Sequence, residues 1–329
     1  MEVASVGSLE VAANDRTLDK AMKSPKIAQK PETIGDCAYE AIDELFHKII
    51  KDEAPVLKDK DPEFLHKMRV STRKLRSTIR LLAPVLDLPK AVNDKSIGKI
   101  AQTLGKVRDL DVIEETLLTL YQPNLDDTDQ KYFVKVLDRM SKKRRQNFAK
   151  IEQMIDGRHY KKFTEAFDRW LAHPRYGKIA SSPIQKVLPE LLIPIIRTLL
   201  QHPGWSIDPR EINQIESYSL VIHDLRKRIK SVRYQTELFI PFYDASFEQQ
   251  VNSFSSAQEV LGLIQDSFVL EDFLRHLLKI DDLKLVLPSL TEQVQQQRLD
   301  AWEQWYSIHQ VYISQDFRES FCDCLMYPM

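Results

Sequence analysis

Two stretches of this 329-residue sequence carry the same order of basic side chains: HKMRVSTRKLR at residues 66–76 and HDLRKRIKSVR at residues 223–233. A histidine comes first in each, and arginine or lysine follows after three, seven and ten positions. The offset between them is 157 residues, and the same offset relates Gly105 and Asp109 to Gly262 and Asp266. Six matches at one offset, without a gap, indicate that the chain contains two copies of one unit.

Each stretch predicts a helix with a basic face and an apolar face. At about 100° per residue, four arginines fall beside His66 on one narrow stripe, while Leu65, Met68 and Leu75 fall on a separate face that should pack against other helices. The second copy repeats this arrangement. The stripe residues are His66, Arg69, Arg73, Arg76 and Arg80 in the first copy, and His223, Arg226, Lys230 and Arg233 in the second.

Such stripes have two interpretations. Residues 66–80 contain six lysines and arginines and no acid, so no neighbour on the same helix neutralises them. They could be solvated helix surfaces, or they could pair with acids on other helices. A solvated face has no reason to keep arginine in register between two copies, whereas a shared anionic ligand explains the register directly. Guanidinium groups match phosphate oxygens in geometry and stay charged.

Composition indicates a globular all-α protein. Hydrophobic residues make up 43% and charged residues 29% of the chain, and only 8 glycines occur. The net charge of −1 predicts no general affinity for nucleic acid, so anion binding has to come from local charge. Three cysteines fit a reducing, cytoplasmic setting. No apolar run is long enough to predict a membrane span or a secretion signal.

The hydrophobic pattern predicts helices along most of the chain. Residues 1–30 are expected to form a flexible tail, and a first helix begins near Thr33 and ends before Pro55. Further helices are expected at about 62–83, 90–121, 128–155, 160–172, 183–201, 211–240, 246–279 and 289–320.

Four sequence elements together resemble the CHAD family, the conserved histidine α-helical domain. The stretch from His66 to Arg76 is similar to its HxxRVxxRRLR signature, and the stretch from His223 to Tyr234 is similar to the second-half counterpart. LGKVRDLDV at 104–112 resembles the LGxxRDxDV element, and LGLIQDSFV at 261–269 resembles LGxxHDxxV. Gln265 stands where that last element has histidine, and Lys230 where the first copy has Arg73.

The resemblance implies an all-α fold of two helical bundles, related by pseudo-twofold symmetry around a basic groove or pore that binds inorganic polyphosphate. The domain would cover residues 31–329, with one half at 31–180 and the other at 181–329. Both stripes would contact the ligand. Asp109 and Asp266, with Arg108, would orient the arginines and relieve repulsion among them. Lys143 and Arg144, from the basic run at 142–145, are further candidate ligands.

The sequence favours binding over catalysis. The common phosphate-transfer and metal-hydrolase motifs are missing, and so is the Glu-x-Glu pair of the hydrolase that often accompanies CHAD domains. We therefore expect no enzymatic activity, no cofactor and no metal site. A nucleic-acid-binding helical protein and a scaffold that docks an acidic partner remain open as alternatives. So do the oligomeric state and a location on polyphosphate storage granules.

Overall fold

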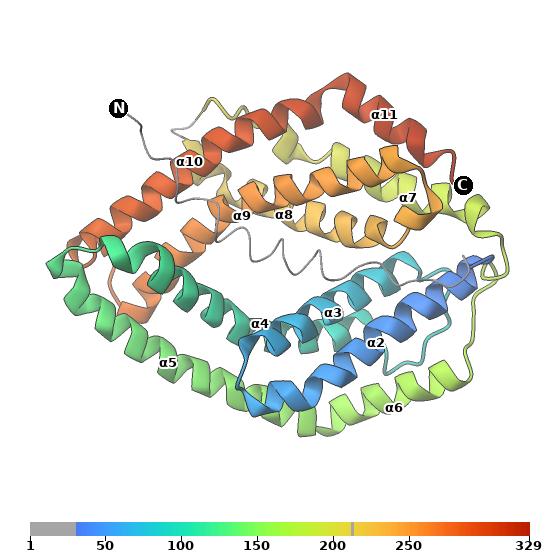
Figure 1. The fold of residues 1–329 in the computed structure, drawn as a ribbon, viewed down its shortest axis with the longest axis horizontal. Helices are drawn as coiled ribbons and strands as arrows, with labels where there is room; N and C mark the ends of the chain where they lie inside the picture. Colours follow the sequence, from blue (N-terminus) through green and yellow to red (C-terminus); the bar gives the residue numbers. More distant parts are fainter. Residues whose placement is uncertain (1–30, 212–213) are drawn as a thin grey trace. The chain divides into compact units, whose positions relative to one another are not determined.

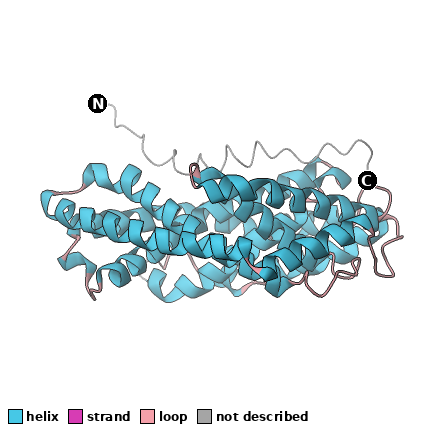
Figure 2. Ribbon diagram, turned by 90° about the horizontal axis from the view of Figure 1, so that it is seen from below, coloured by secondary structure: helices cyan, strands magenta, loops and turns pink. Residues whose placement is uncertain are grey.

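Helices make up most of the chain that this computed structural model describes, residues 31–211 and 214–329. The expected tail at residues 1–30 lies outside the described residues. No β-strand occurs in the described part, so the all-α prediction is confirmed (Figure 2). The α-helices are α2 (Ile34–Lys58), α3 (Pro62–Leu81), α4 (Asp94–Thr116), α5 (Asp127–Asp156), α6 (Arg158–Ala172), α7 (Ile184–Leu200), α8 (Ile215–Glu237), α9 (Ala245–Leu278), α10 (Pro288–Ile313) and α11 (Gln315–Leu325).

Local chemistry explains where several helices begin. The side chains of Thr33, Asp61, Asn93 and Asp126 each accept a hydrogen bond from a backbone N–H in the first turn of the following helix. At Asn93 the bond is reciprocal, since the Ser96 hydroxyl lies against the Asn93 N–H, which makes a capping box. These caps supply partners for amide groups that a helix start otherwise leaves unpaired.

Two of the expected helix limits are wrong. α2 continues through Pro55 to Lys58, because Val56 beyond the proline is only 2% exposed and its burial helps to offset the lost backbone hydrogen bond. The pattern at 289–320 contains two helices. Ser314 has extended backbone angles, and its hydroxyl accepts a hydrogen bond from the Phe317 N–H, so it ends α10 and caps α11.

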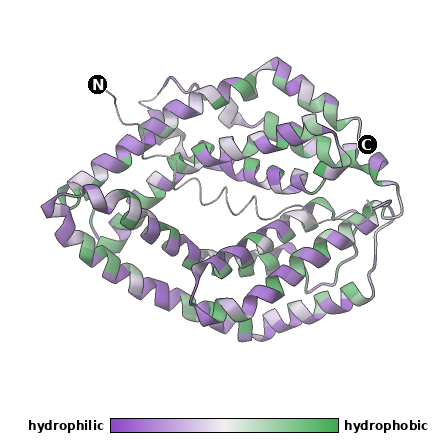
Figure 3. Ribbon diagram, in the orientation of Figure 1, coloured by the Kyte–Doolittle hydropathy of each residue, from purple (hydrophilic) through white to green (hydrophobic). Residues whose placement is uncertain are grey.

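The helices pack as hairpins that share three apolar cores. α3 contacts α2 and α4, α8 contacts α7 and α9, and α9 contacts α10. In Figure 1 the helices of residues 34–172 and those of residues 184–325 form two groups, and α3 and α8 contact each other between the groups. Hydrophilic and hydrophobic residues alternate along each helix in Figure 3, as amphipathic packing requires.

One core lies within residues 42–170, whereas the other two combine residues from both groups of helices. The core around Trp305 and Phe254 also includes Ile34 and Leu82. The third core joins residues 117–140 to residues 270–294. Residues 31–329 accordingly form one compact unit.

Candidate functional site

The two basic stripes lie on α3 and α8, and the apolar faces of these helices are buried as predicted. Leu65, Met68 and Leu75 of α3 are at most 3% exposed, and Leu225 and Ile229 of α8 are fully buried. Burial of these residues fixes the rotation of each helix about its axis. The charged stripe is thereby held on a defined side, towards α4 in one case and α9 in the other.

One arginine of each stripe lies over a glycine and faces an aspartate. Arg69 donates from Nη2 to Asp109 Oδ1 at 3.0 Å, and Arg226 Nη1 lies 3.6 Å from Asp266 Oδ1. A Cβ atom on Gly105 would stand 3.4 Å from Arg69 Nε. The glycines leave room for the guanidinium planes against α4 and α9.

On α9, the corresponding space is tighter. A Cβ atom on Gly262 would stand 3.0 Å from Arg226 Nη2 and 3.3 Å from Nε. The residues of this contact follow those of the Arg69 contact by 157 positions throughout. The structure places Asp109 and Asp266 beside the arginines, and their role in orienting them stays a prediction.

Arg76 and Arg80 bind a carboxylate that the sequence analysis missed. Asp94, at the start of α4, accepts from Arg76 Nε and Nη2 at 2.8 Å each and from Arg80 Nη2 at 2.8 Å. These hydrogen bonds, first from Arg76 and then from Arg80, hold the pKa of Asp94 well below its ordinary range. A search for acids three or four residues away on the same helix could not find this partner.

Arg233, the counterpart of Arg76, has a similar setting with different partners. It donates from Nη1 to Ser255 Oγ at 2.8 Å, and its Nε lies 3.4 Å from Glu237 Oε1. Ser255 follows Gly98 by 157 positions, and a Cβ atom on Gly98 would meet the Arg76 guanidinium at 3.0 Å. Arg233 is only 5% exposed, so it is the most deeply buried arginine of the second stripe.

Charged groups of the two stripes lie within electrostatic reach of each other. Burial lowers the pKa of Arg73, and the positive charges of Arg69 and Arg226 lower it further, although Tyr234 and Asp109 act in the opposite direction. Arg69 belongs to α3 and Arg226 to α8. The stripes therefore converge around Arg73.

The acids opposite the stripes also converge. Burial raises the pKa of Asp266, while Arg226 and Lys230 lower it and Asp109 raises it. Yet its side chain is 63% exposed. The raised pKa and the high exposure are compatible, because the carboxylate contacts solvent while protein surrounds it on several sides. Asp109 comes from α4 and Asp266 from α9, so four helices contribute charges to this region.

Contacts between α3 and α8 hold the two stripes together. Lys74 Nζ lies 3.1 Å from Glu237 Oε2, and Gln235 Nε2 donates to the Ser77 carbonyl at 3.4 Å. The ring of Tyr234 lies between the helices, with Lys74 Nζ 5.4 Å and Lys230 Nζ 5.7 Å from its centroid.

His66 and His223 are half-buried, and the Nδ1 atom of each is shielded from solvent. Burial lowers the pKa of His223, and the neighbouring cations Lys227 and Arg226 lower it further. These effects favour the neutral form of His223, which can still donate a hydrogen bond from one ring nitrogen.

Lys143, Arg144 and Arg108 have contacts outside the stripes. Arg144 donates to both Asp59 oxygens at 2.7 Å and to Asp111 at 2.6 Å, and Lys143 Nζ lies 4.9 Å from the centre of the Phe273 ring. Arg108 lies within electrostatic reach of Glu63 and Asp111. The structure thus does not bring Arg144 to the stripes as an unpaired cation.

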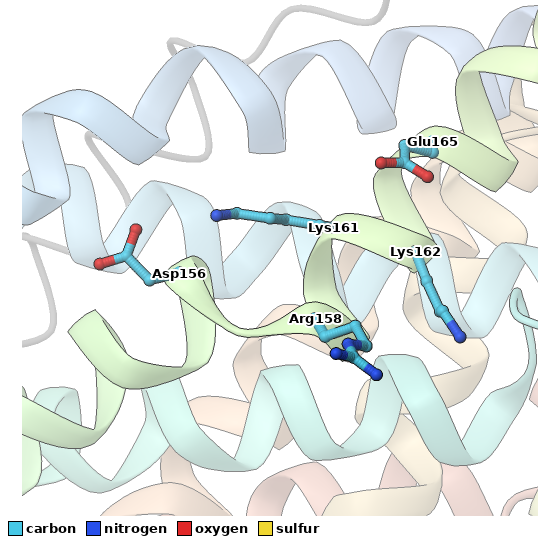
Figure 4. A pocket seen from close by; sticks show the side chains of 5 residues that line it. All are labelled: Asp156, Arg158, Lys161, Lys162 and Glu165. Carbon is cyan, nitrogen blue, oxygen red and sulfur yellow. The ribbon is translucent and has the colours of Figure 1, made fainter.

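A separate pocket lies at the turn between α5 and α6. It is lined by Asp156, Arg158, Lys161, Lys162 and Glu165 (Figure 4). None of these residues belongs to a stripe. Among the residues that the structure describes, no group of three His, Cys, Asp or Glu could hold a metal ion. Within the same residues, every helix is too short or too polar to cross a membrane.

Comparisons with known proteins identify the fold and the family. No curated protein sequence matches the chain. The crystal structure of the CHAD domain from the plant Ricinus communis is similar, with a TM-score of 0.62 and 21% identity over 94% of this chain and 98% of that chain. PptA from Streptomyces chartreusis has a TM-score of 0.56 and 14% identity over 88% of this chain and 99% of that chain.

These two structures share the fold. The sequence profile of the CHAD domain matches residues 40–275, most of the chain, including both stripes and both glycine–aspartate elements. The chain therefore belongs to the CHAD family.

Proposed function

We propose that this protein binds inorganic polyphosphate without catalysis, in one site formed by α3 and α8. The observation that carries the proposal is the contact between α3 and α8, which brings Arg69 and Arg73 of one helix within electrostatic reach of Arg226 of the other. Clustered cations repel each other, and a polyanion would offset that repulsion. Membership of the CHAD family supports this ligand class.

We also propose that the chain contains two copies of one structural unit. The contacts Arg69–Asp109 and Arg226–Asp266 support it, since they join residues at the same offset and lie over equivalent glycines. A linear chain of phosphates presents the same oxygens along its length. Two equivalent stripes could therefore bind successive segments of one ligand, and Asp109 and Asp266 would keep the arginines extended towards it.

The stripe residues are not equivalent in this proposal. His66, Arg69, Arg73, His223, Arg226 and Lys230 are the principal ligands. Arg69 and Arg226 each face one carboxylate, at 3.0 and 3.6 Å, whereas Arg76, Arg80 and Arg233 each make at least two contacts with internal partners and would contribute long-range charge and their remaining N–H groups. Lys143 and Arg144 would contribute less, because Arg144 already pairs with two carboxylates.

Nucleic acid is a less suitable ligand. Binding of single strands usually relies on exposed aromatic rings on which bases stack. Among the described residues, the exposed tyrosines are at positions 132, 176, 306 and 327, and none lies on α3, α4, α8 or α9. Polyphosphate needs no stacking surface.

The test is a competition titration at several salt concentrations. Labelled long-chain polyphosphate is bound first, and duplex DNA, single-stranded RNA and an acidic peptide of equal charge serve as competitors. We expect polyphosphate to bind most tightly. Tighter binding of DNA or RNA would favour nucleic-acid recognition, and tighter binding of the acidic peptide would favour a docking scaffold.

A further inference from the structure

Tyr234 lies where the two stripes meet, with cations of α3 and α8 around its ring. Its side chain is only 6% exposed. Cations surround its ring from both helices: Lys74 of α3, and Lys230 and Arg233 of α8, lie 5.4 to 5.7 Å from the ring centroid. Arg73 of α3 is also within electrostatic reach.

These cations change the acidity of the phenol. Burial by itself would raise the pKa of Tyr234, because a phenolate is poorly stabilised away from water. Lys230, Arg233, Arg73 and Lys74 more than compensate, so the pKa is lowered from its ordinary value. A negative charge at this position is therefore stabilised even though the side chain is buried.

The tyrosine has no equivalent in the first copy. Ser77 stands 157 residues earlier, and its backbone carbonyl accepts a hydrogen bond from Gln235, the residue next to Tyr234. At the contact between α3 and α8, the Tyr234 ring is reached by Lys74 of α3 and by Lys230 of α8. A single tyrosine serves both stripes.

We propose that Tyr234 belongs to the anion site, where its O–H group donates to a bound phosphate and where its phenolate competes with that phosphate for the same cations. The proposal rests on the polyphosphate function. A phosphate oxygen next to the phenol would favour the protonated form, which donates. Loss of the proton would place two negative groups beside each other.

The competition predicts a linkage between pH and affinity. Polyphosphate binds the protonated phenol, so its affinity should fall as pH rises through the lowered pKa of the free protein, by at most about tenfold per pH unit. The charged groups that act on the phenol are Arg73 and Lys74 from α3, and Lys230 and Arg233 from α8. Glu237 of α8 pairs with Lys74 and Arg233. The test therefore needs a variant without the hydroxyl.

Tyr234→Phe provides that variant, since it keeps the ring and its contacts with the cations. Affinity for long-chain polyphosphate is measured from about pH 7 to about pH 9.5, below the ordinary lysine pKa. We expect Tyr234→Phe to bind about tenfold more weakly at pH 7, as loss of a hydrogen bond to a charged group predicts. Its affinity should fall less steeply with pH than that of the wild type.

Tyr243→Phe is the matched control. Tyr243 is also buried, and its hydroxyl donates to the Leu325 carbonyl at 3.2 Å, away from the stripes. This variant should keep the wild-type affinity and pH dependence. A second readout is the tyrosinate absorbance difference between wild type and Tyr234→Phe, whose midpoint should move to higher pH when long-chain polyphosphate is added.

The outcomes separate the two proposals. No binding of polyphosphate by the wild type overturns both the function and the role of Tyr234. Binding by the wild type with equal affinity and equal pH dependence in Tyr234→Phe overturns only the role of Tyr234. An absorbance midpoint that polyphosphate leaves unchanged also overturns it.

Discussion

Replacement of Gly262 by alanine should make the protein at least as stable but a weaker binder. Gly262 lies in the interior of α9, where alanine is favoured over glycine by about 1 kcal/mol. The new Cβ atom would stand 3.0 Å from Arg226 Nη2 and 3.3 Å from Nε, so the guanidinium has to move by a few tenths of an ångström. It is the end of a flexible side chain, and its 3.6 Å contact with Asp266 is loose, so the movement costs little folding energy.

The substitution should instead weaken the affinity for polyphosphate. A hydrogen bond to a charged group contributes about 1.5–3 kcal/mol, and a displaced arginine should lose part of that. About 1 kcal/mol corresponds to a roughly fivefold weaker affinity. Urea unfolding monitored by circular dichroism gives the stability, and titration with long-chain polyphosphate gives the affinity. The midpoint should stay or rise while the affinity falls.

Gly105→Ala is the matched control in the first copy. Its Cβ atom would stand 3.4 Å from Arg69 Nε, which is ordinary contact, and Asp109 holds Arg69 at 3.0 Å. This variant should bind polyphosphate within about twofold of the wild type, because the Arg69 side chain does not have to move. Wild-type affinity in Gly262→Ala would refute the role of Arg226 as a ligand. Equal weakening in both variants would show that the difference in spacing has no effect.

Three other predictions concern the stripes and their chemistry. Replacing Arg69, Arg73 and Arg76 together, or Arg226, Lys230 and Arg233 together, should flatten the slope of log affinity against log salt by roughly 2 to 3; an unchanged slope in one triple variant would mean that its stripe does not share the site. The purified protein, supplied with magnesium or manganese, should release no phosphate from polyphosphate in an assay of free phosphate, and release above background would contradict the non-catalytic proposal. Asp94→Asn should remove stability of about 1 kcal/mol or less at pH 7, because the groups involved are a third to a half exposed. The pKa of Asp94 is depressed in the folded protein, so the wild type should lose this contribution only as pH falls below about 4. If the variant and the wild type lose stability in parallel during acid unfolding, the pair contributes nothing to stability.

Periodicity predicted the helices well because burial of one face determines both their existence and their rotation. Leu65, Met68 and Leu75 are buried where the pattern placed them, and the stripe follows from their position. The predicted ends of two helices were wrong, because a sequence signal near each end was misjudged. Pro55 is a strong stop signal, yet the core accepts Val56 beyond it. At Ser314 a single capping hydroxyl divides a continuous apolar pattern.

The partners of the cations could not be predicted in the same way. Asp94 lies 14 and 18 residues from the arginines it binds, and its position depends on how α4 packs against α3. Arg144 reaches Asp59 at the end of α2, 85 residues away. The contact of Tyr234 with Lys74 depends on the crossing of α3 and α8. A helical wheel describes one helix, so contacts between helices remain outside it.

The core that joins residues 117–140 to residues 270–294 has a consequence for any division of the chain into separate pieces. Asp129 is fully buried there, and its Oδ2 accepts from the Ser289 hydroxyl at 2.8 Å and from the Leu290 N–H at 2.7 Å. Neither half of the sequence buries this surface by itself. A chain cut between the two segments would expose this apolar surface to water, so we expect the separated pieces to be unstable.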